Sequence, residues 1–357
     1  MAAPSTSKAS VVFAGGSALR ILRAAQSAGV RFQATTKGAC LPSRSPRLEQ
    51  VCSAIDLVDG MLAGLRLERP VTLLAGAGAH RSVEGLYAVS SCSAALPKGS
   101  LLRVAKGVFV CSPELAFLRE ASRGADDVEL LELGFELCGT YRMIDGMPHY
   151  DLEPLTSASR IRNFINRTDG IQGRRAALQA CQWLLDGSGS PAETALAIVL
   201  GLPYRKGGFG LRDFVLNREI TLNESAAHLL GRQTMRPDIY FVPTRHPVEF
   251  DGRMFHSGND QLEFDQRRRA AYDAMGMGVT VLTTRHLLNT SLLNEEMKAL
   301  RRNVGQRQNR VPANYDMLQA ELFANAFRYW QDLHREYGSG TEFGLRASSW
   351  DEPDSPW

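Results

Sequence analysis

The chain has 357 residues, of which 44% are hydrophobic and 22% charged, an ordinary balance for a protein with a packed core. Its formal net charge of +3 is too small to indicate a nucleic-acid-binding protein by itself, so any basic surface would have to be local. The six cysteines form no Cys-x-x-Cys pair and no apolar run is long enough to cross a membrane, which argues against a zinc ribbon and a membrane protein. We therefore expect a cytoplasmic protein of two or three domains, with an oligomeric state that the sequence leaves open.

The N-terminal region allows two interpretations. The first 48 residues contain seven basic residues and no acidic one, as organellar transit peptides do. The alternative is a strand over residues 11–14, a Gly-Gly turn and a helix over residues 17–26, in which Ala18, Ile21, Leu22 and Ala25 share one face. We favour the structured alternative.

Residues 1–145 are predicted to form a small α+β region. Its expected elements are a helix over 48–63, strands over 71–74, 85–89, 101–104 and 108–110, and helices over 113–123 and 128–140. The helix near residue 113 has the clearest start, because Ser112 can cap it and Pro113 suits its first position.

The second half is predicted as a helical linker, a larger domain and a tail. The linker covers residues 146–187, the domain 188–337 and a disordered tail 338–357. Expected elements are helices over 158–168, 172–185 and 191–200, strands over 214–217, 239–242 and 247–250, a helix over 262–275, a strand over 279–283, and helices over 286–302 and 315–337.

Three carboxylates lie in or next to two apolar runs of this domain. Asp238 opens the expected strand 239–242, and Glu249 lies inside the next run with Asp251 two residues further on. Alternating side chains place Glu249 and Asp251 on one face of a strand, where they repel unless a cation lies between them or one is protonated. A divalent metal held by oxygen ligands would resolve that conflict. Two solvated carboxylates at a sheet edge are the alternative.

Five further residues are candidates with ordinary alternatives. His256 could position or deprotonate a water, although a lone histidine after an aromatic residue is more often structural. Glu193 has the spacing of a helix cap from Ser190, which explains it without catalysis. Arg236, Arg267 and Arg268 could contact phosphates, but consecutive arginines cannot share one helical face, and a solvated surface is the alternative.

The order of these elements resembles the restriction-endonuclease-like, PD-(D/E)xK fold. A helix with Glu193, a strand with Pro237-Asp238, a strand with Glu249-Phe250-Asp251-Gly252, a helix and a strand follow one another over residues 188–290. Three segments are similar to very-short-patch-repair endonucleases and their relatives, namely Arg236-Pro237-Asp238, the run from Asp251 to His256, and Asp265-Gln266-Arg267-Arg268 before Val279-Thr280-Val281-Leu282. We therefore expect a mixed sheet flanked by helices.

The resemblance implies a site for Mg²⁺ or Mn²⁺ and hydrolysis of DNA. Asp238 and Glu249 would be metal ligands, with the backbone carbonyl of Phe250 as a further ligand and Glu193 as an outer or second-metal carboxylate. Asp251 occupies the position at which the common motif has a lysine, and it cannot supply that positive charge. The repair-type relatives also lack this lysine, and the resemblance implies that His256 takes over part of its role.

The first half resembles a different family. Leu96-Pro97-Lys98-Gly99-Ser100 and the segment from Val110 to Leu115 are similar to the C-terminal portion of AbiEi-type abortive-infection antitoxins. This implies a bacterial defence, repair or mobile-element protein, with a toxin or defence-system protein as a partner. A non-catalytic DNA-binding regulator of the antitoxin type is the main alternative to an endonuclease, and an interaction module with merely exposed carboxylates is a third.

Overall fold

The computed structural model describes residues 10–35, 38–39, 41–62, 65–79, 81–252, 259–308 and 310–337. It is 44% helical and 18% strand, with mixed sheets flanked by helices, so the predicted α+β class is confirmed. The chain divides into two compact units, Met1–Cys138 with Arg142–Leu184 and Gly139–Tyr141 with Leu185–Trp357. None of the described helices combines the length and apolarity needed to cross a membrane. The predicted tail lies outside the described residues.

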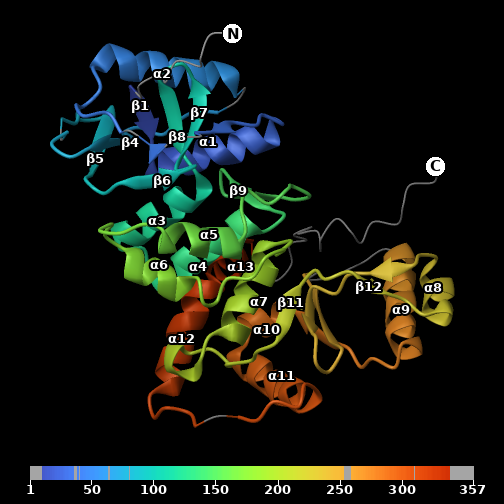
Figure 1. Ribbon diagram of the computed structural model, residues 1–357. Coiled ribbons are helices and arrows are strands. Elements are labelled where there is room, and N and C mark those ends of the chain that lie inside the picture. The colour runs from blue at the N-terminus through green and yellow to red at the C-terminus, as the bar shows by residue number, and fades with distance from the viewer. Residues whose placement is uncertain are drawn as a thin grey trace. The chain divides into compact units, whose positions relative to one another are not determined.

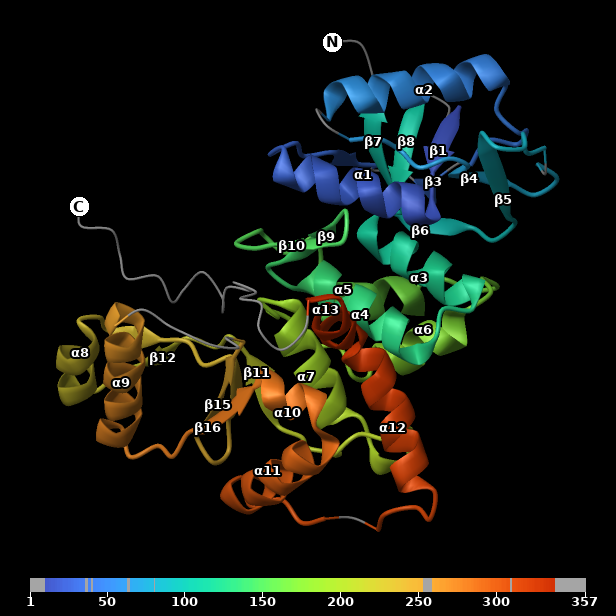
Figure 2. The same cartoon turned by 180° about the vertical axis from the view of Figure 1, so that it is seen from behind.

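A six-stranded mixed sheet is the centre of the first unit (Figures 1 and 2). Its spatial order is β2 (Gln33–Ala34), β7 (Leu101–Ala105), β8 (Val108–Cys111), β1 (Val11–Phe13), β4 (Val71–Gly76) and β5 (Tyr87–Cys92). Strand β1 pairs in parallel with β8 and antiparallel with β4, and it is buried at every position. A separate pair joins β3 (Gly38–Ala39) to β6 (Leu96–Lys98).

Two long helices lie on opposite sides of this sheet in both views. They are α1 (Gly15–Ser27) and α2 (Leu48–Met61). Helix α1 buries the four predicted side chains, Ala18, Ile21, Leu22 and Ala25. The structured interpretation of this N-terminal segment is therefore confirmed.

Four helices and a hairpin complete the first unit. They are α3 (Pro113–Arg123), α4 (Asp127–Cys138), α5 (Ala158–Asn166), α6 (Arg174–Ala180) and the hairpin of β9 (Arg142–Ile144) and β10 (Met147–His149). The predicted cap of α3 is confirmed, because the Ser112 hydroxyl accepts a hydrogen bond from the Leu115 N–H at 3.3 Å. Helices α5 and α6 pack against α3, so the segment expected as a linker belongs to this unit as far as Leu184. The hairpin was not predicted.

The second unit is built on a four-stranded sheet. Its spatial order is β11 (Phe214–Leu216), β14 (Ile239–Phe241), β15 (His246–Asp251) and β16 (Thr280–Thr283). The first three strands are antiparallel, and β15 and β16 are parallel. Together with α7 (Pro191–Gly201) before β11 and α9 (Asn259–Ala274) between β15 and β16, the chain order is helix, three strands, helix, strand.

Helices cover both faces of this sheet (Figures 1 and 2). Both views show α9 and α8 (Glu224–Leu230) on one side, and α7 and α12 (Tyr315–Ala326) on the other. All three residues of β14 are buried, as expected for a strand covered on both faces. Helix α8 and the pair β12 (Ile220–Thr221) and β13 (Thr234–Met235) lie in the chain between β11 and β14 and were not predicted.

The C-terminal helices differ from the prediction. The single helix expected over 286–302 is two helices, α10 (Thr284–Leu288) and α11 (Thr290–Asn303), because Asn289 is extended and its side chain caps α11 through the Leu292 N–H at 3.0 Å. The helix expected over 315–337 is also divided, into α12 and α13 (Arg328–Tyr337). Helix α12 approaches the short 3₁₀ helix η1 (Tyr204–Lys206) closely, and a Cβ at Gly207 would lie only 2.2 Å from the Leu318 carbonyl oxygen.

Candidate functional site

Three polar residues form a row across the sheet of the second unit. The strand pairs Leu216↔Ile239 and Ile239↔Val248, continued by one residue, place Asn217 opposite Asp238 and Asp238 opposite Glu249. The Asn217 N–H donates to the Asp238 carbonyl at 3.1 Å, which supports this register. Asp238 and Glu249 oppose one another directly, so their side chains lie on the same face of the sheet. Asn217 follows the strand, and its side chain is directed to Gly187 and Glu193. Two of the three predicted carboxylates are therefore neighbours in the fold.

Asp238 is a buried carboxylate at the entrance to β14. Only 6% of the residue is exposed. Its Oδ2 atom accepts a hydrogen bond of 2.6 Å from the backbone N–H of Phe250, the residue that follows Glu249. A buried carboxylate needs such donors, since desolvation penalises its charged form. This bond brings the Asp238 carboxylate next to the part of β15 that carries Glu249.

Glu249 is held by two side chains of helix α9. Arg268 forms an ion pair with its Oε2 atom at 2.9 Å, and the Tyr272 hydroxyl donates a hydrogen bond to Oε1. The Glu249 side chain is 14% exposed and that of Arg268 15%. Burial, and then the negative charge of Glu249, raise the pKa of Tyr272 well above its usual value, so the phenol stays protonated and donates.

The other residues predicted near Glu249 have different positions. Asp251 is the last residue of β15, half-buried and two residues from Glu249, so both belong to one strand and point to the same face. Phe250 lies between them, and its backbone, the source of a predicted carbonyl ligand, also supplies the N–H that Asp238 accepts. His256 lies outside the described residues.

Glu193 lies at the N-terminus of α7, where the helix dipole favours a carboxylate. The residue is 2% exposed, and Ser190 caps the helix through the Glu193 N–H at 3.2 Å, as predicted. Its Oε2 atom accepts a hydrogen bond of 2.7 Å from the Gly189 N–H and another from the Asn217 side chain. Glu193 is thus linked through Asn217 to the strand that carries Asp238.

Asn217 is the residue of this site that the sequence analysis missed. It follows β11 with a φ angle of +47°, in the left-handed region that asparagine tolerates better than most residues. Its amide nitrogen donates to the Gly187 carbonyl at 3.0 Å and to Glu193. Its Oδ1 atom is buried and has no hydrogen-bond partner among the described residues. An asparagine directly after an apolar strand was the signal that could have identified it.

The three arginines predicted to bind nucleic acid differ in their surroundings. Arg268 is directed to Glu249 and also donates to the Arg236 carbonyl at 2.7 Å. Arg236 pairs with Glu219 at 2.9 Å. Arg267 forms an ion pair with Glu263 on the same helix and keeps 54% of its side chain exposed. Of the three, Arg267 is therefore the most accessible to a phosphate.

The oxygen donors of the row suit a hard divalent cation in their chemistry. They are the carboxylates of Asp238 and Glu249. The Oδ1 atom of Asn217 is a further buried oxygen without a hydrogen-bond partner among the described residues. Within the described part of the chain, no three His, Cys, Asp or Glu side chains are grouped closely enough to hold a metal by themselves. Because Glu249 faces Arg268, a cation bound there has to compete with the guanidinium group. Asp238 and Glu249 therefore fit a metal ion provided that the ion displaces the Arg268 guanidinium from Glu249.

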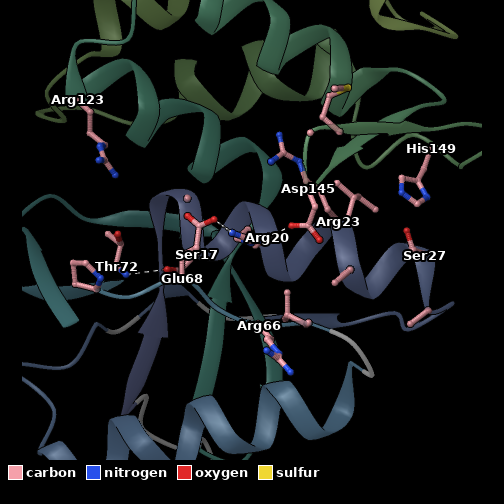
Figure 3. Close-up of a pocket in the computed structure, with 18 residues that line it drawn as sticks. Ser17, Arg20, Arg23, Ser27, Arg66, Glu68, Thr72, Arg123, Asp145 and His149 are labelled. Atoms are coloured by element: carbon pink, nitrogen blue, oxygen red, sulfur yellow. Dashed lines mark hydrogen bonds and ion pairs between the residues drawn. The ribbon is translucent and has the colours of Figure 1, made fainter. Parts of the chain in front are cut away.

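The first unit contains a separate cavity of about 1010 Å³ beside α1 (Figure 3). Arginines line it, but acidic side chains engage three of them, including Arg123, whose partner Glu120 is 4.0 Å away. Arg20 contacts Glu68 and Asp145, and Arg23 binds Glu136, which lies outside the lining, through two bonds of 2.7 and 2.6 Å. None of the predicted site residues lines this cavity. The row in the second unit therefore remains the candidate site.

Comparisons of this chain with protein-family models, curated proteins and solved structures found no match.

Proposed function

We propose that the second unit is a metal-dependent endonuclease that hydrolyses phosphodiester bonds of DNA. The observation that carries the proposal is the register that places Asp238 opposite Glu249, so that two carboxylates belong to one face of the sheet. The chain order of α7, β14, β15, α9 and β16 supports it, because the resemblance to PD-(D/E)xK enzymes implies a helix, two strands, a helix and a strand in that order. The resemblances also suggest a role in bacterial defence, repair or mobile-element biology, and a toxin or defence-system partner stays a prediction.

In this proposal Asp238 and Glu249 hold Mg²⁺ or Mn²⁺. A bound ion supplies Lewis acidity and lowers the pKa of a bound water, so that hydroxide is available at neutral pH. The Phe250 N–H fixes the Asp238 carboxylate, and Tyr272 fixes that of Glu249. Arg267, which is more than half exposed, is suited to contact a DNA phosphate.

A plasmid-nicking assay with Mg²⁺ or Mn²⁺ tests the proposal. The informative variant is Asp238→Asn, because an amide oxygen can still accept the Phe250 N–H while the charge is lost. We expect at least about a hundredfold loss of nicking, comparable to the loss of other transition-state stabilising groups. Asp273→Ala, at an exposed position of α9, is the control and should nick like the wild type. Equal nicking by Asp238→Asn and the wild type would contradict the proposal.

A second candidate function is a non-catalytic, DNA-binding regulator of the antitoxin type. The observation that favours it is the ion pair between Glu249 and Arg268, which satisfies the carboxylate without a metal. Asp251, in the position of the motif's lysine, points the same way. This function requires salt-dependent DNA binding in EDTA that survives Glu249→Ala, with no nicking in any metal. Loss of DNA binding on removal of the metal would exclude it.

A further inference from the structure

We infer that Arg268 is the internal counter-ion of the site, and that a divalent cation and the Arg268 guanidinium compete for Glu249. The inference rests on the proposed metal site. It adds a residue with a defined electrostatic role, and it predicts a change in metal affinity that can be measured without DNA.

Arg268 lies between two segments of the chain. Its Nη2 atom lies 2.9 Å from Glu249 Oε2 on β15 and 2.7 Å from the carbonyl oxygen of Arg236. Arg236 is two residues before Asp238. One guanidinium group therefore ties the segment that carries Asp238 to the strand that carries Glu249.

The position of Glu249 makes a negative charge on it costly without a partner. Its side chain is largely buried, and a buried carboxylate stays ionised only where a positive group or several donors stabilise it. The residue two positions along the strand is Asp251, an acid, where the resembling motif would place a lysine. Arg268 supplies the missing positive charge from helix α9, a different element of the fold.

The two carboxylate oxygens of Glu249 have partners of different charge. Tyr272 donates to Oε1 as a neutral hydroxyl, and Arg268 pairs with Oε2 as a cation. A metal ion bound to this carboxylate repels the guanidinium but not the phenol, because like charges a few ångströms apart in a poorly solvated site interact strongly. Competition with the metal is therefore specific to Arg268.

The consequence follows from linkage between the two events. If the metal weakens the contact of Arg268 with Glu249, then Arg268 weakens the binding of the metal by the same factor. Removal of Arg268 should tighten metal binding while lowering the stability of the metal-free protein. A purely structural arginine has the opposite effect on the metal, because its loss disorders the site.

The experiment is thermal unfolding of the full chain during titration with Mn²⁺ or Mg²⁺ in the absence of DNA. We compare the wild type with Arg268→Ala, Arg268→Lys, Tyr272→Phe, Glu249→Gln and Arg267→Ala. Arg267→Ala is the matched control, because it removes a neighbouring arginine whose partner, Glu263, lies outside the site.

The expected result has three parts. Arg268→Ala melts at a lower temperature without metal and reaches half-maximal stabilisation at about a tenfold lower metal concentration. Arg268→Lys falls between it and the wild type, since a lysine keeps the charge but not the two-acceptor geometry. Arg267→Ala changes the metal midpoint little, Tyr272→Phe does not lower it because only a positioning hydrogen bond of Glu249 is lost, and Glu249→Gln abolishes the response.

Other outcomes separate the inference from the proposed function. An unchanged or weakened metal response in Arg268→Ala, with the response still lost in Glu249→Gln, overturns the inference and leaves the metal site intact. Equal tightening by Arg268→Ala and Tyr272→Phe also overturns it, because loosening of Glu249 would then explain the effect without charge. If metal changes the melting temperature of neither the wild type nor Arg268→Ala, there is no metal site, and both the proposed function and the inference are wrong.

Discussion

Asn217 joins three segments of the second unit through one residue. Its backbone N–H binds Asp238, its amide nitrogen binds Gly187 and Glu193, and its φ angle is +47°. Both the side-chain hydrogen bonds and the left-handed backbone conformation of Asn217 therefore contribute to holding these segments together. The buried Oδ1 atom of Asn217 has no hydrogen-bond partner among the described residues.

Two substitutions separate these contributions of Asn217. Asn217→Gly removes the side-chain hydrogen bonds but tolerates a positive φ, whereas Asn217→Ala removes the same bonds and adds backbone strain. We expect both to lower the free energy of unfolding, with Ala lower than Gly by about 1 kcal/mol. Urea denaturation measures the difference. If alanine were the more stable of the two, the left-handed conformation would not be a constraint at this position.

Single residues differ in how far the sequence could predict them. Ser112 and Ser190 were predicted correctly as caps because the acceptor and the donor lie within three residues of each other. Arg268 was expected to contact phosphate, and nothing in a run of three arginines says which of them turns inward. That choice depends on where α9 lies against β15, which is a tertiary property.

The parallel pair of β15 and β16 contains a buried histidine. His246 is 6% exposed, and its Nε2 atom lies 2.9 Å from the Thr280 hydroxyl on the neighbouring strand. Desolvation lowers the pKa of His246 below its ordinary value of 6.5. The ring is therefore neutral in the folded protein at a pH where an unfolded chain already binds a proton.

This histidine makes the second unit less stable in mild acid. Because the unfolded state takes up the extra proton, the free energy of unfolding should be constant above pH 7 and fall as the pH drops below about 6.5. His286 has a lowered pKa for the same reason and adds to the effect. Replacing His246 by Gln should make the decline between pH 7.5 and 5.5 shallower in urea titrations. An unchanged slope in the variant would assign the acid sensitivity to other groups.

The elements of the central sheet were predicted well, and those around it were not. Runs such as Ile239–Phe241 are apolar, short and bounded by turn residues, so local pattern identifies them. The pairs β12–β13 and β9–β10 have only two or three residues per strand and depend on their partners. The split between α10 and α11 depends on an asparagine cap inside what otherwise reads as one helix.

At the scale of the whole molecule, each compact unit has its own sheet and its own core. Phe13 in the first unit and Phe241 in the second are both fully buried. Truncating a buried Phe to Ala typically costs 3–5 kcal/mol. We expect calorimetry to show two transitions, with Phe13→Ala lowering one and Phe241→Ala the other. If either variant lowered a single common transition, the two units would unfold as one.

The segment between β11 and β14 gives the candidate site an unusual dependence on distant sequence. Its Ile220, Leu222, Ala226 and Met235 share a hydrophobic cluster with Ala271 and Tyr272 of α9, and the Asn223 side chain donates to the Ala274 carbonyl at 2.8 Å. The segment between β11 and β14 thus supports helix α9, which carries Arg268 opposite Glu249. Substitutions or loop grafts in this segment are therefore expected to shift α9, and with it the Arg268 guanidinium, without altering any strand that bears a carboxylate.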